Sequence, residues 1–280
     1  MPKCGQHCKG FARVAPDAFR KAVAEDRVLV GPFVKLPSPQ LVEILGAAGF
    51  DFAIFDMEHG ALSMESIESL VRSADVAGIT PIVRIPEGDL PLISRVLDVG
   101  ARGVVVPHIC DARTARDVVK YAKFAPQGER SICRFVRAAA FSARDPEDYL
   151  AHANDETVVI GMLEGLDGIA NLDEIVAVPG IDVVFVGPYD LSQALGIPGR
   201  VTSHQVVAEM KRIVDCTRSV RKMAGVFVDN LRAAEMWIQA GVRFIAYMVD
   251  VGIYHEACRK IVEGVTRIAS GGALHSDETG

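Results

Sequence analysis

Short apolar runs alternate with amphipathic stretches along most of the chain. The apolar runs are rich in valine, isoleucine and phenylalanine, which predicts strands that are buried on both faces. Eight such runs can be counted: residues 27–36, 51–60, 80–86, 102–109, 157–163, 181–187, 223–230 and 243–250. The stretches between them repeat apolar positions three and four apart, as amphipathic helices do. Eight strand–helix units in alternation predict an α/β fold of the (β/α)8 TIM-barrel type.

An open, doubly wound sheet is the alternative to a barrel. No GxGxxG sequence follows the first predicted strand, so nothing favours a dinucleotide-binding sheet. No linker divides the chain, and we therefore expect residues 1–280 to form a single domain. A short helix is expected from Ala15 to Asp26, and flexible tails are expected at residues 1–14 and 271–280.

Two further segments carry local expectations. One amphipathic helix is predicted over residues 168–180, closed by Pro179 and Gly180, and Asp111 is a predicted N-cap. Residues 125–153 contain no predicted strand and form an insertion between the fourth and fifth strands. A long insertion of this kind is usually a functional loop or an oligomer contact. Its charged residues include four arginines: Arg130, Arg134, Arg137 and Arg144.

Composition excludes several classes of function. The net charge is −6 and no basic stripe is present, so nucleic-acid binding is not expected. No apolar run approaches the ~20 residues of a membrane span. The first residues lack the apolar core of a signal peptide, which favours a cytoplasmic protein. Six scattered cysteines do not suggest a disulfide framework, and the close trio Cys4, His7 and Cys8 has no second ligand pair to complete a soft-metal site.

Two acids follow neighbouring predicted strands. Glu164 comes directly after the fifth apolar run and Asp190 comes shortly after the sixth. The carboxyl ends of barrel strands are where TIM-barrel enzymes place their active sites. Carboxylate oxygens suit Mg²⁺ or Mn²⁺, and two of them leave room for a bidentate substrate and water. General acid/base catalysis by the pair, as in glycosidases, is the alternative.

Polar residues also end the second and third strands. Asp56 and His59 resemble a base with an orienting acid, although spacing alone does not say whether Asp56 or Glu58 orients the imidazole. Arg84 follows a buried apolar run, and its guanidinium suits a carboxylate or a developing oxyanion. A structural salt bridge inside the barrel mouth is the other interpretation of Arg84.

Other candidates carry weaker signals. Gly187 and Pro188 shape a turn before Tyr189, and backbone N–H groups of such a turn could receive a carboxylate. The arginines at positions 130, 134 and 137 could meet an acidic substrate, but a solvated loop or a subunit contact is favoured. His108 ends the fourth strand and is left open between a functional and a structural role.

Five segments together resemble the HpcH/HpaI aldolase family of class II, metal-dependent pyruvate aldolases. They are FDMEHG, PIVRIP, SRVLDVGARGVVVPHI, MLEG followed by NLDEI, and VFVGPYDLSQALG, in that order. The resemblance implies a TIM barrel, commonly a hexamer (a trimer is the alternative), with the last helix exchanged between subunits. It also implies the following roles: Glu164 and Asp190 as metal ligands, His59 as the catalytic histidine, Asp56 as the acid near it, Arg84 as the arginine facing the keto oxygen, and the turn of Gly187, Pro188 and Tyr189 as the site for the pyruvate carboxylate.

The resemblance implies a reaction as well. A divalent metal, Mg²⁺ or Mn²⁺ with Co²⁺ as an alternative, would hold a small 2-oxo acid, and the C3–C4 bond of a 4-hydroxy-2-oxo acid would be cleaved to pyruvate and an aldehyde. Oxaloacetate decarboxylation of the macrophomate-synthase kind, a CoA-thioester lyase and a non-catalytic barrel are the alternatives. Tyr189 stands where the family often has alanine, and RSICRFVRAAAF replaces a stretch that commonly bears glycine. These departures concern the choice of substrate. Lys35 is the lysine closest to a position for a Schiff base, and no lysine at a strand end is well suited to one.

Overall fold

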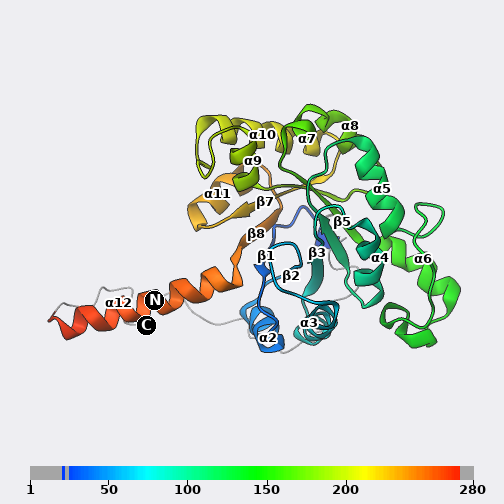
Figure 1. The fold of residues 1–280 in the computed structure, drawn as a ribbon, viewed down its shortest axis with the longest axis horizontal. Coiled ribbons are helices and arrows are strands. Elements are labelled where there is room, and N and C mark those ends of the chain that lie inside the picture. The colour runs from blue at the N-terminus through cyan, green and yellow to red at the C-terminus, as the bar shows by residue number, and fades with distance from the viewer. Residues whose placement is uncertain (1–20, 23–24, 272–280) are drawn as a thin grey trace.

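The structure is a computed structural model that describes residues 21–22 and 25–271 (Figure 1). The expected helix from Ala15 to Asp26, the cysteine-containing start and both tails lie wholly or largely outside these described residues. The strands are β1 (Leu29–Val34), β2 (Phe52–Asp56), β3 (Thr80–Arg84), β4 (Gly103–Val106), β5 (Val158–Leu163), β6 (Val183–Val186), β7 (Met223–Val228) and β8 (Phe244–Val249). All neighbouring pairs are parallel and β8 closes onto β1, so the predicted TIM barrel is confirmed.

Helices follow the strands and surround the barrel (Figure 1). Their bounds are α2 (Pro39–Ala48), α3 (Met64–Ala77), α4 (Leu90–Asp98), α5 (Ala112–Ala122), α6 (Pro146–Glu156), α7 (Leu166–Ala170), α8 (Leu172–Ala177), α9 (Pro188–Ala194), α10 (His204–Ser219), α11 (Leu231–Gln239) and α12 (Asp250–Ala269). Asp111 accepts a hydrogen bond from the Thr114 backbone at 2.6 Å, which confirms it as the N-cap of α5.

The side chains of each strand alternate between two cores, because neighbouring residues on a strand point to opposite faces. The inner core fills the barrel and is rich in phenylalanine. The rings of Phe52 and Phe244 stack there with centroids 4.1 Å apart. The outer core lies between the strands and the helices and is built largely from aliphatic residues. Burial on both faces explains why the strands read as continuous apolar runs.

The structure differs from the expected elements at two places. The helix predicted over residues 168–180 is divided into α7 and α8 at Asn171, whose φ and ψ of −99° and 16° depart from helical values. The Asn171 side chain donates to the Cys110 carbonyl at 2.9 Å, so a tertiary contact accompanies the break. The residues after β6 form the short helix α9 rather than only a turn, with Pro188 in its first turn, where its missing N–H costs nothing.

The insertion lies beside α4 and α5 (Figure 1) and contains no strand, as expected. It holds a short 3₁₀ segment, η1 (Arg137–Ser142), followed by α6. The buried Lys123 side chain donates to the carbonyls of Asn154 and Thr157 at 2.5 and 2.6 Å. These bonds fasten the end of the insertion to the end of α5.

The last strand and helix complete the ring. Asp250 is buried at the start of α12, and its carboxylate accepts hydrogen bonds from the backbone N–H groups of Lys35 and Leu36. Helix α12 then extends away from the barrel (Figure 1). Of the helices that the structure describes, none combines the length and the hydropathy that crossing a bilayer requires.

Candidate active site

An ion pair links the ends of β2 and β3. Asp56 and Arg84 are opposite each other in the strand register, and both are buried. The Arg84 Nε and Nη2 atoms donate to the two carboxylate oxygens of Asp56 at 2.9 and 2.7 Å. Burial alone would raise the pKa of Asp56, but the hydrogen bonds and charge of Arg84 outweigh burial and hold that pKa below its ordinary value. Arg84 also lies over the ring of Phe33, 4.6 Å from its centroid.

The loop after β2 adds further charges to this pair. Backbone N–H groups of Glu58 and His59 donate to Asp56 at 3.1 and 3.2 Å, so the carboxylate organises the loop. Glu58 lies 3.1 Å from Arg84 Nη1 and 3.9 Å from His59 Nε2. Burial raises the pKa of Glu58, with Arg84 and His59 opposing that rise. The acid nearest the imidazole is therefore Glu58, while Asp56 contacts His59 through its backbone.

Glu164 is buried at the end of β5. Its Oε1 accepts a hydrogen bond from the His108 backbone N–H at 3.0 Å and lies 3.7 Å from His108 Nδ1. Burial raises the pKa of Glu164 to about 7; His108 opposes the rise, and the negative charges of Asp190 and Glu58 add to it. His108 has a φ of 50°, an uncommon value for a residue other than glycine, at this contact.

The turn after β6 covers Glu164. A Cβ at Gly187 would lie 2.6 Å from Glu164 Oε2, so any other residue at this position would require that carboxylate to shift. Pro188 and Tyr189 begin α9, and Asp190 is an exposed residue in its first turn. The Tyr189 hydroxyl donates to Asp229 at 2.9 Å, and its ring packs edge-on against Phe227.

Several of these groups line one cavity of about 270 Å³ at the carboxyl ends of the strands. The predicted site residues that line it are Asp56, His59, Arg84, Gly187, Pro188, Tyr189 and Asp190. Glu164 lies behind Gly187 rather than on the cavity surface. Candidates from β2–β3 and from the turn after β6 thus line the same cavity.

The sequence interpretation assigned no site role to several residues of this cavity. Lys35 directly follows β1, and its Nζ is 3.8 Å from Asp56 Oδ2. Its position at a strand end was the signal that could have identified it. The apolar wall is formed by Phe33, Met162, Phe185, Phe227 and Val249. In the sequence these residues cannot be distinguished from ordinary core residues. Only the closed barrel shows which apolar side chains lie at the carboxyl ends of the strands and line the cavity.

The arginines of the insertion lie elsewhere. Arg130 pairs with Asp98 and Arg137 pairs with Asp75, both at 2.6 Å, and Arg134 is exposed. None of these arginines lines the cavity at the carboxyl ends of the strands. The structure therefore does not place these arginines in contact with a substrate held in that cavity.

Glu164, behind the cavity wall, and Asp190, in that wall, are acidic groups that fit a divalent cation. Glu164 is a buried carboxylate whose close partner at 3.0 Å is a neutral N–H group, and Asp190 adds negative charge nearby. A cation would supply the missing positive charge. Within residues 25–271, no three His, Cys, Asp or Glu side chains are grouped as a complete metal site. Two carboxylates would leave the other positions of an oxygen-rich shell to substrate and water, as Mg²⁺ sites commonly do.

A closed barrel with charged residues in a cavity at the carboxyl ends of its strands is the architecture of a TIM-barrel enzyme. The model of the HpcH/HpaI aldolase/citrate lyase family matches residues 29–257, and the chain belongs to this family.

Relatives in sequence and structure agree with the family assignment. The chain is 34% identical to a hydroxypyruvate/pyruvate aldolase of Cupriavidus necator over 248 residues, which cover 88% of this chain and 91% of that protein. It is 28% identical to a 5-keto-4-deoxy-D-glucarate aldolase of Shigella boydii, with 89% and 96% covered. The crystal structure of an HpcH/HpaI aldolase/citrate lyase family protein from Burkholderia cenocepacia is similar, with a TM-score of 0.84, 32% identity and 89% and 99% covered. These relatives are named aldolases or members of an aldolase family, and dependence on a divalent metal is typical of that family.

Proposed function

We propose that this protein is a class II pyruvate aldolase that cleaves, or in reverse forms, the C3–C4 bond of a 4-hydroxy-2-oxo acid. The observation that carries the proposal is the shared cavity of about 270 Å³, where the Asp56–Arg84 pair and His59 face the turn that covers Glu164. A cavity of this volume suits a small acid. Membership of an aldolase family supports the same reaction class.

Glu164 and Asp190 are the residues that would hold the metal, which we propose to be Mg²⁺ or Mn²⁺, with Co²⁺ as an alternative. When bound, such an ion acts as a Lewis acid that polarises the keto oxygen of the substrate. Gly187 contributes by its missing side chain, since any Cβ there would displace the Glu164 carboxylate.

Arg84 is the proposed partner of the oxygen that becomes negative as the bond breaks. A guanidinium has five N–H donors. Three of its contacts are made to Asp56 and Glu58, so donors remain for a substrate oxygen. Because both carboxylates hold the side chain in place, Arg84 is preorganised for the developing charge.

His59 is the proposed general base. Glu58 lies near its Nε2, which leaves the other ring nitrogen to accept the proton of the C4 hydroxyl. The electrons of that O–H bond form the aldehyde carbonyl, and those of the C3–C4 bond become the enolate of pyruvate. The carboxylate of the 2-oxo acid is proposed to bind at the turn of Gly187, Pro188 and Tyr189.

Lys35 raises the question of a Schiff base mechanism. Its Nζ lies 3.8 Å from the Asp56 carboxylate, so this side chain already has an ionic partner in the cavity. We therefore propose that Lys35 helps to hold the acid in the cavity rather than acting as a nucleophile.

Pyruvate release tests the reaction. A panel of 4-hydroxy-2-oxo acids, oxaloacetate and malyl- and citramalyl-CoA is followed by coupling to lactate dehydrogenase, with acetyl-CoA release followed separately for the thioesters. We expect turnover of one or more hydroxy-oxo acids, loss of turnover in EDTA, and recovery with Mg²⁺ or Mn²⁺. Turnover confined to thioesters, or no turnover at all, would reject the aldolase.

A borohydride experiment tests the mechanism separately. Full activity in EDTA, with substrate trapped covalently in the wild type but not in Lys35→Arg, would reject the metal mechanism in favour of a Schiff base. We expect no trapping in either protein.

We also propose that the chain forms homo-oligomers, trimers or hexamers, through α12. Only Asp250 is buried in this helix, while Tyr254, Ile261, Val262 and Val265 are exposed. Exposed apolar surface of this kind commonly marks an interface. Light scattering after size-exclusion chromatography tests this, and a monomer at micromolar concentration would contradict it. A cytoplasmic location is proposed as well, because the four described cysteines are free thiols.

A further inference from the structure

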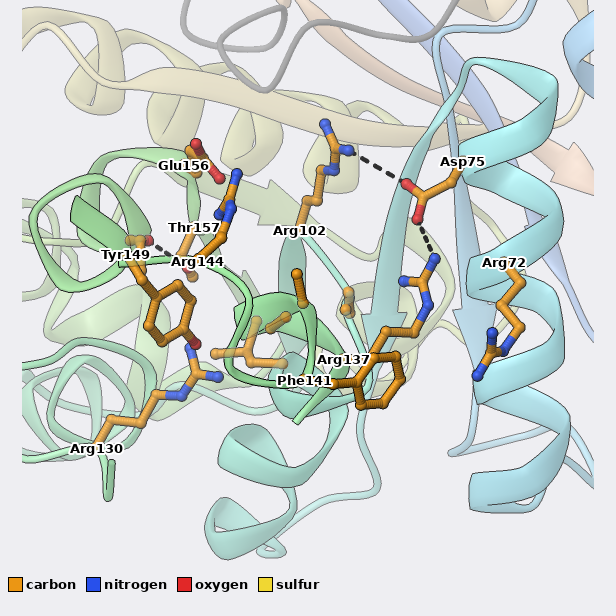
Figure 2. A pocket seen from close by; sticks show the side chains of 16 residues that line it. Arg72, Asp75, Arg102, Arg130, Arg137, Phe141, Arg144, Tyr149, Glu156 and Thr157 are labelled. Atoms are coloured by element: carbon orange, nitrogen blue, oxygen red, sulfur yellow. Dashed lines mark hydrogen bonds and ion pairs between the residues drawn. The ribbon is translucent and has the colours of Figure 1, made fainter. Parts of the chain in front are cut away.

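A second cavity has a volume of about 580 Å³ (Figure 2). It lies at the opposite end of the barrel from the catalytic mouth. Its wall includes Arg102 and Thr157, which directly precede β4 and β5. The catalytic groups instead follow the strands. A four-residue strand spans about 13 Å, so the two cavities are separate.

Arginine dominates the charged lining of this second cavity. Two of its side chains are acidic, Asp75 and Glu156, whereas five are arginines: Arg72, Arg102, Arg130, Arg137 and Arg144. The arginines come from α3, from the start of β4 and from the insertion, so segments far apart in the sequence combine to form the wall. Converging guanidinium groups are the usual recognition element for carboxylate and phosphate.

Arg137 is held in a defined position in this wall. Its Nη2 lies 2.6 Å from Asp75, and Arg102 lies 3.2 Å from the other oxygen of the same carboxylate (Figure 2). The Arg137 Nη1 atom is 2.3 Å from where a Cβ at Gly100 would be, so the guanidinium rests directly on that glycine. Two guanidinium groups therefore share one acid, and both line the cavity.

Two other arginines differ in burial. Arg130 is buried, paired with Asp98 and packed on the ring of Phe124, so it is part of the supporting wall. Its Nε is buried and has no hydrogen-bond partner within the described chain. Arg144 is only partly buried, and no ion pair or hydrogen bond joins its side chain to another described residue. Arg144 is thus available to a ligand.

Backbone strain lies at the rim of the cavity. Ala140, Phe141 and Ser142 have φ values of 50°, 54° and 76°, which residues other than glycine seldom adopt. Ala140 and Phe141 line the cavity, and the Phe141 side chain is exposed. Strained, exposed apolar residues beside converging charges are typical of a binding site.

We propose that this cavity binds a small organic anion with at least two negatively charged groups. The volume is too large for a single inorganic ion, and apolar residues such as Leu97, Ala138 and Phe141 are suited to the carbon skeleton. Arg137 and Arg144 bind the charged groups directly. The shared chemistry, a carboxylate or a phosphate ester, is what a guanidinium recognises.

Titration calorimetry with 3-phosphoglycerate and with tricarballylate tests the proposal and separates the two kinds of anion. The full chain is used with Mg²⁺ and saturating pyruvate, which carries a single negative charge, so that the catalytic cavity is occupied by an anion outside the proposed ligand class. We expect one site per chain for at least one probe, with Kd below about 1 mM. Glycerol, which is uncharged, is expected not to bind.

Arg144→Gln and Arg137→Gln are the test variants, and Arg116→Gln is the matched control because this exposed arginine of α5 lines neither cavity. Each test variant is expected to weaken binding by about tenfold or more, and the control by less than about twofold. Arg144→Gln removes no ion pair or side-chain hydrogen bond between described residues, so it stays informative if Arg137→Gln unfolds.

Three results would overturn the proposal. The first is no binding of either probe at about 10 mM. The second is binding that Arg144→Gln and Arg137→Gln leave unchanged. The third is a changed oligomeric state in Arg144→Gln together with no probe binding to the wild type, which would assign the cavity to a contact between copies of the chain.

Discussion

Replacing Glu164 by glutamine is expected to stabilise the metal-free protein while removing its response to metal. The carboxylate is buried and accepts a hydrogen bond from the His108 backbone N–H. The amide oxygen of glutamine can accept the same hydrogen bond. The substitution therefore keeps the shape and the hydrogen bond and removes only the negative charge. A merely structural acid would show the opposite effect on stability, because its loss would leave a partner unpaired.

The magnitude follows from the pKa of Glu164. Burial raises this pKa from its ordinary value of 4.5 to about 7. A carboxyl group whose pKa is higher in the folded state destabilises that state increasingly as the pH rises from the unfolded to the folded pKa. The cost at pH 8 is about 3 kcal/mol, and it disappears below about pH 4.5. The variant should therefore gain roughly 5–10 °C in Tm at pH 8 and nothing at pH 4.

The assay is thermal unfolding in EDTA and in Mn²⁺, at fixed protein concentration, across this pH range. We expect Mn²⁺ to raise the Tm of the wild type but not that of Glu164→Gln. Glu43→Gln, an exposed acid on α2, is the control and should match the wild type throughout. A variant that is less stable than the wild type in EDTA at pH 8, or that keeps the Mn²⁺ response, would refute the reasoning.

Three other substitutions test separate parts of the site. Asp56→Asn should lower the free energy of unfolding by about 3 kcal/mol at pH 7, because it leaves Arg84 buried without its acid. The difference from the wild type should shrink below pH 4, because the lowered pKa of Asp56 gives stability that is lost as that carboxylate is protonated. Equal differences in urea unfolding at both pH values would contradict this. Gly187→Ala should weaken Mn²⁺ binding, measured by calorimetry, by about tenfold with little change in Tm, since its Cβ would meet the Glu164 carboxylate 2.6 Å away while its φ of −88° suits alanine; unchanged affinity would place the metal elsewhere. Tyr189→Phe removes one hydrogen bond at a half-exposed side chain. It should alter the KM for the aldehyde severalfold and change the free energy of unfolding by less than about 1 kcal/mol. An unchanged KM across several aldehydes would show that Tyr189 does not select the substrate.

The sequence was sufficient for the architecture because the strands are largely buried on both faces. Period and turn residues then mark each strand and helix almost independently of the others. The exception at Asn171 shows the limit of this reasoning: its bond to the Cys110 carbonyl joins residues 61 positions apart, and no local pattern contains that information.

The candidate site was predictable in part for a related reason. Acids and an arginine at strand ends can be read from spacing, but their pairing cannot. Arg84 meets Asp56 because β2 and β3 align in register, and Glu58 rather than Asp56 lies nearest the His59 ring because of the loop that follows β2. Lys35 reaches the cavity only once the barrel is closed.

Asp250 has a consequence for how the protein is made. Its bonds to the backbone of Lys35 and Leu36 bridge more than 210 positions of the chain. The catalytic cavity likewise takes Phe33 from the first strand and Val249 from the last. A chain still being translated therefore has two unpaired strand edges and no assembled cavity until its eighth strand has left the ribosome. During synthesis there is therefore a long interval in which most strands have been made but the active site has not formed. A chaperone that shields the two strand edges would act during this interval.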